Sequence, residues 1–267
     1  MLSFIEILRP ANCFMAAVAV YIGALVAGSG YVPGALLLYA MASALLICGA
    51  GMVINDFFDT AIDRVNVPER PIPSGRMKRN VALVYSVMLF AAGVALGYMI
   101  NIYTTAIALF ASSILVFYAW KLKKLPVLGN LFVSMLVALT FIYGGFVHGN
   151  YVPTLILAPL AFLANTGREV YKEITDVLGD RQHGAETVAV KYGVIKAKMV
   201  AAICVIFAII LSFLPFFLNM FGFVYLFFVV VADMMFMAAI IVPTKLAPKV
   251  CKFAMLVALL AFLAGGM

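Results

Sequence analysis

The sequence predicts an all-α membrane protein with nine transmembrane helices, and three observations lead to that prediction. First, 66% of the 267 residues are hydrophobic and only 11% are charged, with a mean hydropathy of +1.16, whereas soluble proteins are about half apolar and a quarter charged. Second, the apolar runs are about 20 residues long, the length that a helix needs to cross a bilayer. Third, the charged residues gather in alternate links. A soluble enzyme, a disordered chain and a disulfide scaffold are thereby excluded.

Nine apolar runs follow one another and form a single domain over residues 1–267. They lie near residues 11–28, 35–56, 80–99, 101–119, 126–147, 152–177, 196–217, 220–242 and 247–266. Glycine, proline and asparagine separate several of them, but only the interval from Tyr98 to Tyr103 marks the turn between the third and the fourth. Because the runs are continuous, they also disfavour an outer-membrane barrel, whose strands alternate in polarity.

The charged residues predict the orientation of the chain in the membrane. With nine spans, all 18 lysine and arginine residues fall on one side, before the first run and around the links that follow the second, fourth, sixth and eighth. The positive-inside rule then predicts a cytoplasmic N-terminus and a C-terminus outside. The net charge of +7 therefore indicates topology and affinity for anionic lipids or substrates, and no nucleic acid is expected as a partner.

Ten of the eleven acidic residues lie on the same face as the basic ones, and the exception is Asp233 in the eighth run. Transporters usually place polar groups near the bilayer midplane. A lipid-phosphate or ion transporter is therefore the less favoured, non-enzyme alternative. For Asp233 a functional role and a packing role remain equally open.

The first cluster of oxygen-bearing side chains ends the second apolar run. It consists of Asn55, Asp56, Asp59 and Asp63, with Arg64 directly after it. At about 100° per residue, its members fall within roughly 100° of a helix circumference. They are therefore expected to share one face at the cytoplasmic end of that helix.

The second cluster ends the sixth run and consists of Glu169, Glu173, Asp176 and Asp180, with Arg181 after it. The same arithmetic places these carboxylates within roughly 60°, although Gly179 is a possible helix end before Asp180. Carboxylates on one face repel each other near lipid, and a divalent cation neutralises them. Oxygen ligands favour Mg²⁺, which binds a few carboxylates together with substrate phosphate.

A proline-rich segment follows the first cluster and carries further cations. Pro68, Pro71 and Pro73 stiffen the link between the second and third helices. This segment is expected to hold Arg64, Arg70 and Arg76 over the site as a phosphate clamp, since guanidinium groups form paired hydrogen bonds with phosphate oxygens. A linking segment with no role in substrate binding is the alternative.

A phosphate site at the mouth of a lipid-embedded bundle indicates a substrate with a charged head and an apolar tail. Ionisation of an allylic diphosphate suits such a site, because cations stabilise the departing diphosphate and a dry cavity protects the allylic cation from water. Phe57, Phe58, Tyr118 and Tyr171 are candidates for stabilising that cation through their π faces. Ordinary packing is the more common role for each of them.

The motif Asn55-Asp56-x-x-Asp59-x-x-x-Asp63-Arg64, followed by Arg70-Pro71-Ile72-Pro73-Ser74-Gly75, resembles the signature of the UbiA superfamily of intramembrane prenyltransferases. Asp176-x-x-x-Asp180 matches the second motif of that family. The resemblance covers the whole chain. It implies a helical bundle around a central cavity that opens to lipid, and Mg²⁺-dependent transfer of a prenyl group to a lipophilic acceptor.

Three stretches are similar to the archaeal members that build ether lipids: Leu8–Cys13, Arg168-Glu169 with Lys172-Glu173, and Asp176-Val177-x-Gly179-Asp180-Arg181. That similarity implies transfer of a geranylgeranyl group from its diphosphate to the free hydroxyl of geranylgeranylglyceryl phosphate. A glutamate at position 173, where the family pattern has aspartate, is not expected to bind metal directly. An aromatic acceptor, such as a quinone or haem precursor, is the alternative within the family.

The resemblance also implies roles for individual residues. The implied metal-site residues are Asn55, Asp56, Asp59, Asp63, Asp176 and Asp180. The implied catalytic residues are Asp59, Asp63, Asp176, Asp180 and Lys121. The implied diphosphate and substrate contacts are Arg9, Asn12, Arg64, Arg70, Arg76, Tyr118, Lys121, Arg168, Lys172 and Arg181. Lys123 and Lys124 are expected to contact lipid headgroups, and no residue stands out as a general base.

Overall fold

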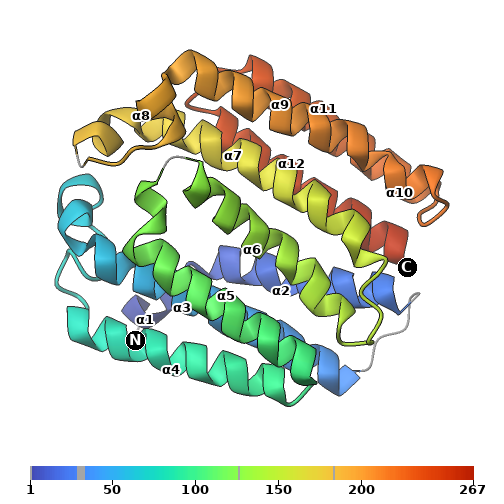
Figure 1. The fold of residues 1–267 in the computed structure, drawn as a ribbon, viewed down its shortest axis with the longest axis horizontal. Helices are drawn as coiled ribbons and strands as arrows, with labels where there is room; N and C mark the ends of the chain where they lie inside the picture. The colour runs from blue at the N-terminus through green and yellow to red at the C-terminus, as the bar shows by residue number, and fades with distance from the viewer. Residues whose placement is uncertain (1, 29–33, 126, 183) are drawn as a thin grey trace.

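The computed structural model describes residues 2–28, 34–125, 127–182 and 184–267, and this part of the chain is helical without strands (Figure 1). Its long helices are α2 (Pro10–Ala27), α3 (Gly34–Asn66), α4 (Arg79–Tyr98), α5 (Ile102–Trp120), α6 (Leu128–Gly145), α7 (Thr154–Gln182), α9 (Val194–Ser212), α11 (Phe223–Ile241) and α12 (Ala247–Gly266). Short helical turns are α1 (Leu2–Glu6), η1 (Leu122–Lys124), α8 (Val188–Tyr192) and α10 (Leu214–Phe217).

Eight of the long helices in the described ranges are apolar and long enough to cross a membrane, which confirms an all-α, multi-pass membrane protein. The ninth, α7, is not among them, because its second half carries Arg168, Glu169 and the charged residues that follow. The count of nine spans therefore stays a prediction. The turn after Tyr98 is where the sequence predicts it, and Asn101 caps α5 there by accepting hydrogen bonds from the backbone N–H groups of Tyr103 and Thr104.

Two glycines allow α2 and α6 to cross at very short range. A Cβ atom at Gly23 would lie 2.1 Å from the carbonyl oxygen of Phe141, and one at Gly144 would lie 2.1 Å from that of Val20. Small residues at helix contacts are typical of membrane proteins, where van der Waals packing between backbones replaces the hydrophobic effect. This crossing fixes α2 beside α6, and both helices line the cavity described below.

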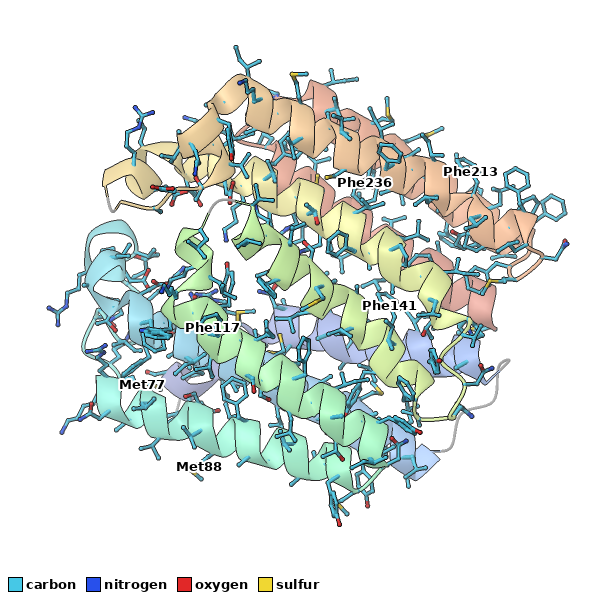
Figure 2. All side chains as sticks on the ribbon, viewed as in Figure 1. Met77, Met88, Phe117, Phe141, Phe213 and Phe236 are labelled. Carbon is cyan, nitrogen blue, oxygen red and sulfur yellow. The ribbon has the colours of Figure 1, made fainter. Side chains whose placement is uncertain are left out.

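The helices form a bundle whose outer side chains are apolar and whose centre is hollow. Met88 points outward and is exposed, whereas Phe141 and Phe236 are buried inside (Figure 2). Helix α12 packs against α2, α7 and α11, and α6 packs against α2, α5 and α7. The C-terminal ends of α3, α5 and α7 gather at one end of the bundle (Figure 1). Both predicted carboxylate clusters are therefore carried to the same end.

Candidate active site

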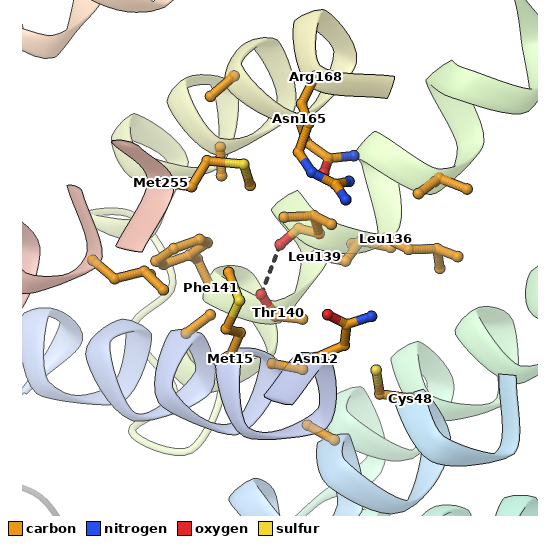
Figure 3. A pocket seen from close by; sticks show the side chains of 18 of the residues that line it. Asn12, Met15, Cys48, Leu136, Leu139, Thr140, Phe141, Asn165, Arg168 and Met255 are labelled. Atoms are coloured by element: carbon orange, nitrogen blue, oxygen red, sulfur yellow. Dashed lines mark hydrogen bonds between the residues drawn. The ribbon is translucent and has the colours of Figure 1, made fainter. Parts of the chain in front are cut away.

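A cavity of about 530 Å³ lies between the helices, with a polar end and an apolar body. Its polar wall includes Arg9, Asn12, Asn55, Arg70, Tyr118, Arg168, Glu169, Lys172 and Lys252. Figure 3 shows Asn12 and Arg168 entering it from α2 and α7 on opposite sides, with Met15, Leu136 and Met255 also in the pocket wall. A mostly apolar cavity with a few converging polar groups is the usual form of a small-molecule site.

Arginines hold two carboxylates of the α3 cluster. Asp56 is 2% exposed; its Oδ1 accepts a hydrogen bond from Arg9 Nη2 at 2.6 Å and lies 3.4 Å from Arg70 Nη1. Arg70 Nη1 also donates to Asp63 Oδ2 at 2.7 Å. Arg9 adopts a left-handed backbone conformation, with φ at 53°, which is uncommon for a residue other than glycine. Its pairing with the buried Asp56 helps to hold that conformation in place.

Asn55 and Asp59 form the other pair on this face of α3. The Nδ2 atom of Asn55 donates to Asp59 Oδ2 at 2.9 Å, as expected for residues four positions apart on a helix. Together with Asp63, one turn further on, these side chains confirm that the first cluster shares a face. That face lies at the polar end of the cavity, since Asn55 itself lines it.

The proline-rich link carries Arg70 to the site but leaves Arg64 and Arg76 elsewhere. Ile72 and Met77 are buried against Ile7 and Val53, which anchors the link to the bundle. Arg76 instead forms two hydrogen bonds with Glu6 of α1, at 2.5 and 2.8 Å. Neither Arg64, which is exposed, nor Arg76 lines the cavity. The expected three-arginine clamp is therefore reduced to Arg70, because the link bends back over α1 after that residue.

Lys123, and not Lys121, is the lysine after α5 that reaches the carboxylates of α3. Helix α5 ends at Trp120, and the η1 turn directs Lys123 toward α3, where its Nζ pairs with Asp59. Lys121 is exposed and does not line the cavity. The expectation that Lys123 contacts headgroups is wrong for its position in the structure. Lys121 and Lys123 offered no signal that distinguished them, because the direction of each depends on the tight turn after α5. The side chain of Lys124, for which headgroup contact is also expected, lies outside the described residues.

The second cluster lies on α7, which continues through Gly179 to Gln182, so Asp180 is helical. Glu169 pairs with Arg168 and lies 3.6 Å from Lys172 Nζ. Glu173 accepts hydrogen bonds from Asn130 Nδ2 at 2.8 Å and from the backbone N–H of Val188 at 3.0 Å. Glu173 thus connects α7 to α6 and α8, and the expectation that it does not bind metal directly stays a prediction.

Carboxylates of both clusters lie near Tyr118 of α5. The charges of Asp59 on α3 and of Glu169, Glu173 and Asp180 on α7 all act on the Tyr118 hydroxyl, and Tyr118 lines the cavity. Two motifs more than a hundred positions apart are therefore neighbours across one polar end. Asp176 and Arg181 are exposed at the same end of α7.

The donor chemistry of this end suits a hard cation. Among the described residues no three His, Cys, Asp or Glu side chains lie close enough to hold a metal ion by themselves. Mg²⁺ usually takes only one or two carboxylates and completes its shell with water and substrate phosphate. Asp59 and Asp63 lie one helical turn apart, and the charges of Asp59 and Asp180 both act on Tyr118, an arrangement that fits that pattern better than a closed protein cage.

Two lining residues of the cavity were missed or left open by the sequence analysis. Lys252 of α12 lines it and donates to Asn12 Oδ1 at 3.2 Å. No sequence signal separates Lys252 from the neighbouring lysines that predict the membrane orientation. Asp233 also lines it, and its Oδ2 accepts a hydrogen bond from Ser212 at 2.7 Å. The partner of Asp233 is thus a hydroxyl group on α9.

The arrangement of helices, the apolar cavity and the paired carboxylate motifs define an intramembrane prenyltransferase. Residues 16–264 match the UbiA prenyltransferase family, and the chain belongs to that family.

Full-length relatives share this assignment. The chain is 43% identical to the digeranylgeranylglyceryl phosphate synthase of Methanosarcina barkeri, with 98% of each chain covered, and 39% identical to that of Methanopyrus kandleri, with 99% of each covered. A solved structure described as digeranylgeranylglyceryl phosphate synthase in membranes superposes with a TM-score of 0.82 at 35% identity, covering 99% of this chain and 97% of that one. A UbiA homolog from Archaeoglobus fulgidus bound to GPP and Mg²⁺ has the same fold, with a TM-score of 0.67 at 17% identity and 98% of each chain covered.

Proposed function

We propose that this prenyltransferase moves a geranylgeranyl group from geranylgeranyl diphosphate to the free hydroxyl of geranylgeranylglyceryl phosphate, which forms the second ether bond of an archaeal membrane lipid. The observation that carries the proposal is the convergence of carboxylates from α3 and α7 on Tyr118, at the polar end of an apolar cavity. The names of relatives that match over the full length support the choice of acceptor.

We assign magnesium to the oxygen atoms of Asn55, Asp59, Asp63, Asp176 and Asp180. Asp56 belongs to the motif, but its pairing with Arg9 and Arg70 favours a role in orienting those arginines. When bound, the metal neutralises the diphosphate and makes it a better leaving group.

Cations at the polar end complete the diphosphate site. Arg70 and Lys123 are held by the carboxylates of α3, so each has a fixed position from which it can also donate to a phosphate oxygen. Such preorganised donors stabilise charge as it develops on the leaving group. Arg9, which also lines the cavity, adds a third cation on this side.

The transfer is redox-neutral. The bond between the first prenyl carbon and the diphosphate oxygen breaks, and its electron pair stays on the diphosphate. A bond then forms between that carbon and the acceptor hydroxyl oxygen, and the hydroxyl proton passes to the departing diphosphate. The apolar body of the cavity, with Leu136, Leu139 and Phe141, holds the prenyl chain and excludes water from the allylic cation.

We further infer that the N-terminus and the polar end of the cavity face the cytoplasm and that the C-terminus lies outside. The basic residues of the links at the polar end support this orientation through the positive-inside rule. It also gives the diphosphate and phosphate headgroups of the two substrates access to the site from the cytoplasm.

The function is tested by separating the products of purified protein chromatographically. We expect labelled digeranylgeranylglyceryl phosphate from labelled geranylgeranyl diphosphate, geranylgeranylglyceryl phosphate and Mg²⁺, and none with a chelator. Asp59→Asn and Asp176→Asn keep side-chain size and remove a charge, and should lower turnover by about 100-fold or more. Glu186→Gln, at an exposed carboxylate paired with Lys191, is the matched control and should keep turnover. Product with an aromatic acceptor alone would contradict the proposal.

A further inference from the structure

Lys252 is a cation on the cavity wall, and none of the described carboxylates neutralises it. It lies in the second turn of α12 and is half-buried, and its Nζ donates to Asn12 Oδ1 of α2 at 3.2 Å. Within the described part of the chain no ion pair involves it. Charged side chains inside a membrane protein usually pair with one another or mark the path of a substrate. The missing counter-charge therefore points to an anionic ligand.

Helix α7, which packs against α12, adds to this positive wall. Arg168 and Lys172 also line the cavity, and both contact the single carboxylate of Glu169. The Nε atom of Arg168 is buried and has no hydrogen-bond partner among the described residues. With Lys252, three cations face one carboxylate, so the wall carries two uncompensated positive charges.

Arg168 and Lys172 lie beside Asp176 and Asp180 on the surface of α7. At about 100° per residue, Arg168 and Lys172 lie within roughly 40° of each other, whereas Asp176 and Asp180 are centred roughly 80° further round the helix. Asn12 and Arg168 approach from opposite sides of the pocket (Figure 3), and Lys252 joins Asn12. Glu169 pairs with Arg168 and Lys172 and its charge also acts on Tyr118, so this wall adjoins the group formed by Asp59, Lys123 and Tyr118.

We propose that Lys252, Arg168, Lys172 and Asn12 bind the phosphate monoester of the acceptor, while the carboxylate end binds the diphosphate. The inference rests on the proposed function and deepens it. A phosphate monoester carries about −1.5 to −2 charge at pH 7, which matches the two uncompensated charges of the wall. Arg168 has a free donor for its oxygens, and Lys252 is positioned by Asn12. The acceptor hydroxyl is then presented between the two phosphate sites.

Two acceptors test the assignment: geranylgeranylglyceryl phosphate and geranylgeranylglycerol, which lacks the phosphate. In Lys252→Ala, we expect KM for the phosphate acceptor to rise by about 10- to 100-fold, the usual effect of one hydrogen bond to a charged group. KM for geranylgeranyl diphosphate and turnover of the phosphate-free acceptor should stay as in the wild type. Lys252→Arg should restore most of the affinity, and Lys249→Ala, one turn earlier on the exposed side of α12, should behave as wild type.

The outcomes separate this inference from the proposed function. If wild-type protein makes no product from the phosphate acceptor, the proposed function fails first. If wild-type protein is active and Lys252→Ala leaves KM for that acceptor unchanged, or raises KM for geranylgeranyl diphosphate instead, the assignment of the phosphate site is overturned. Turnover of the phosphate-free acceptor reports correct folding. Should Lys252→Ala fail to fold, Lys252→Gln, which keeps a donor for Asn12 but no charge, is held to the same criteria.

Discussion

Lys123 pairs with Asp59, which precedes it by 64 positions, and this contact joins the turn after α5 to the proposed metal-binding face of α3. Both side chains are largely buried, with 16% and 15% of their surfaces exposed. Ion pairs with little solvent exposure are weakly screened. The pair therefore fixes Asp59 and places a cation beside the proposed diphosphate site.

Lys123→Ala should lower kcat/KM by about 10- to 100-fold, because it removes a charge-assisted contact and leaves Asp59 without its partner. Lys121→Ala should have a much smaller effect, since Lys121 is exposed and lies outside the cavity. Steady-state kinetics with both substrates measures the difference. A greater loss for Lys121→Ala than for Lys123→Ala would restore the role that the sequence alone indicated for Lys121.

The Glu6–Arg76 pair gives a prediction about pH. The Arg76 guanidinium donates to Glu6 and lowers the pKa of that carboxyl below its usual value of 4.5. A carboxyl with a lowered pKa stabilises the fold above its unfolded pKa, and that contribution is lost as the pH falls through its folded pKa. In an NMR titration, Arg76→Ala should return the pKa of Glu6 toward 4.5, while KM for both substrates stays near wild type. An unchanged pKa in Arg76→Ala would show that the pair does not form.

The α2–α6 crossing gives a prediction about stability. In Gly144→Ala the new Cβ atom would lie 2.1 Å from the Val20 carbonyl oxygen and 2.8 Å from the Ala24 nitrogen, so the two helices must separate. Overpacking of this kind costs about 1–3 kcal/mol and should lower the thermal midpoint in detergent by about 5 °C. Gly34→Ala, where no atom lies within 4 Å of the new Cβ, is the control. Equal midpoints for the two variants would contradict the close crossing.

Much of this arrangement could be predicted from the sequence because its signals are local. Apolar runs give the helices, and the spacing of Asn55, Asp59 and Asp63 places them on one face whatever the tertiary structure. The resemblance to the UbiA superfamily implied one set of metal-site residues drawn from both clusters. The charges of both clusters acting on Tyr118 support that expectation.

Other features depend on geometry that spacing does not specify. The direction of Lys123 is set by a 3₁₀ turn, and the pairing of Arg76 with Glu6 by the bend of the proline-rich link. Lys252 donates to Asn12, which lies 240 positions away. Nothing in the sequence distinguishes Lys252 from the other lysines on the predicted cytoplasmic side. Gly179 is a plausible helix end by itself, but it lies within α7, since tertiary packing outweighs the propensity of a single residue.

The most direct test of the central claim is a structure of this protein with Mn²⁺ and an unreactive thio analogue of geranylgeranyl diphosphate. We expect anomalous manganese peaks between the diphosphate and the carboxylates of Asp59 and Asp63 on α3 and Asp176 and Asp180 on α7, with the prenyl chain in the apolar cavity. Manganese bound by the residues of one helix alone, or a diphosphate bound away from Tyr118, would contradict the claim that the two motifs form one site.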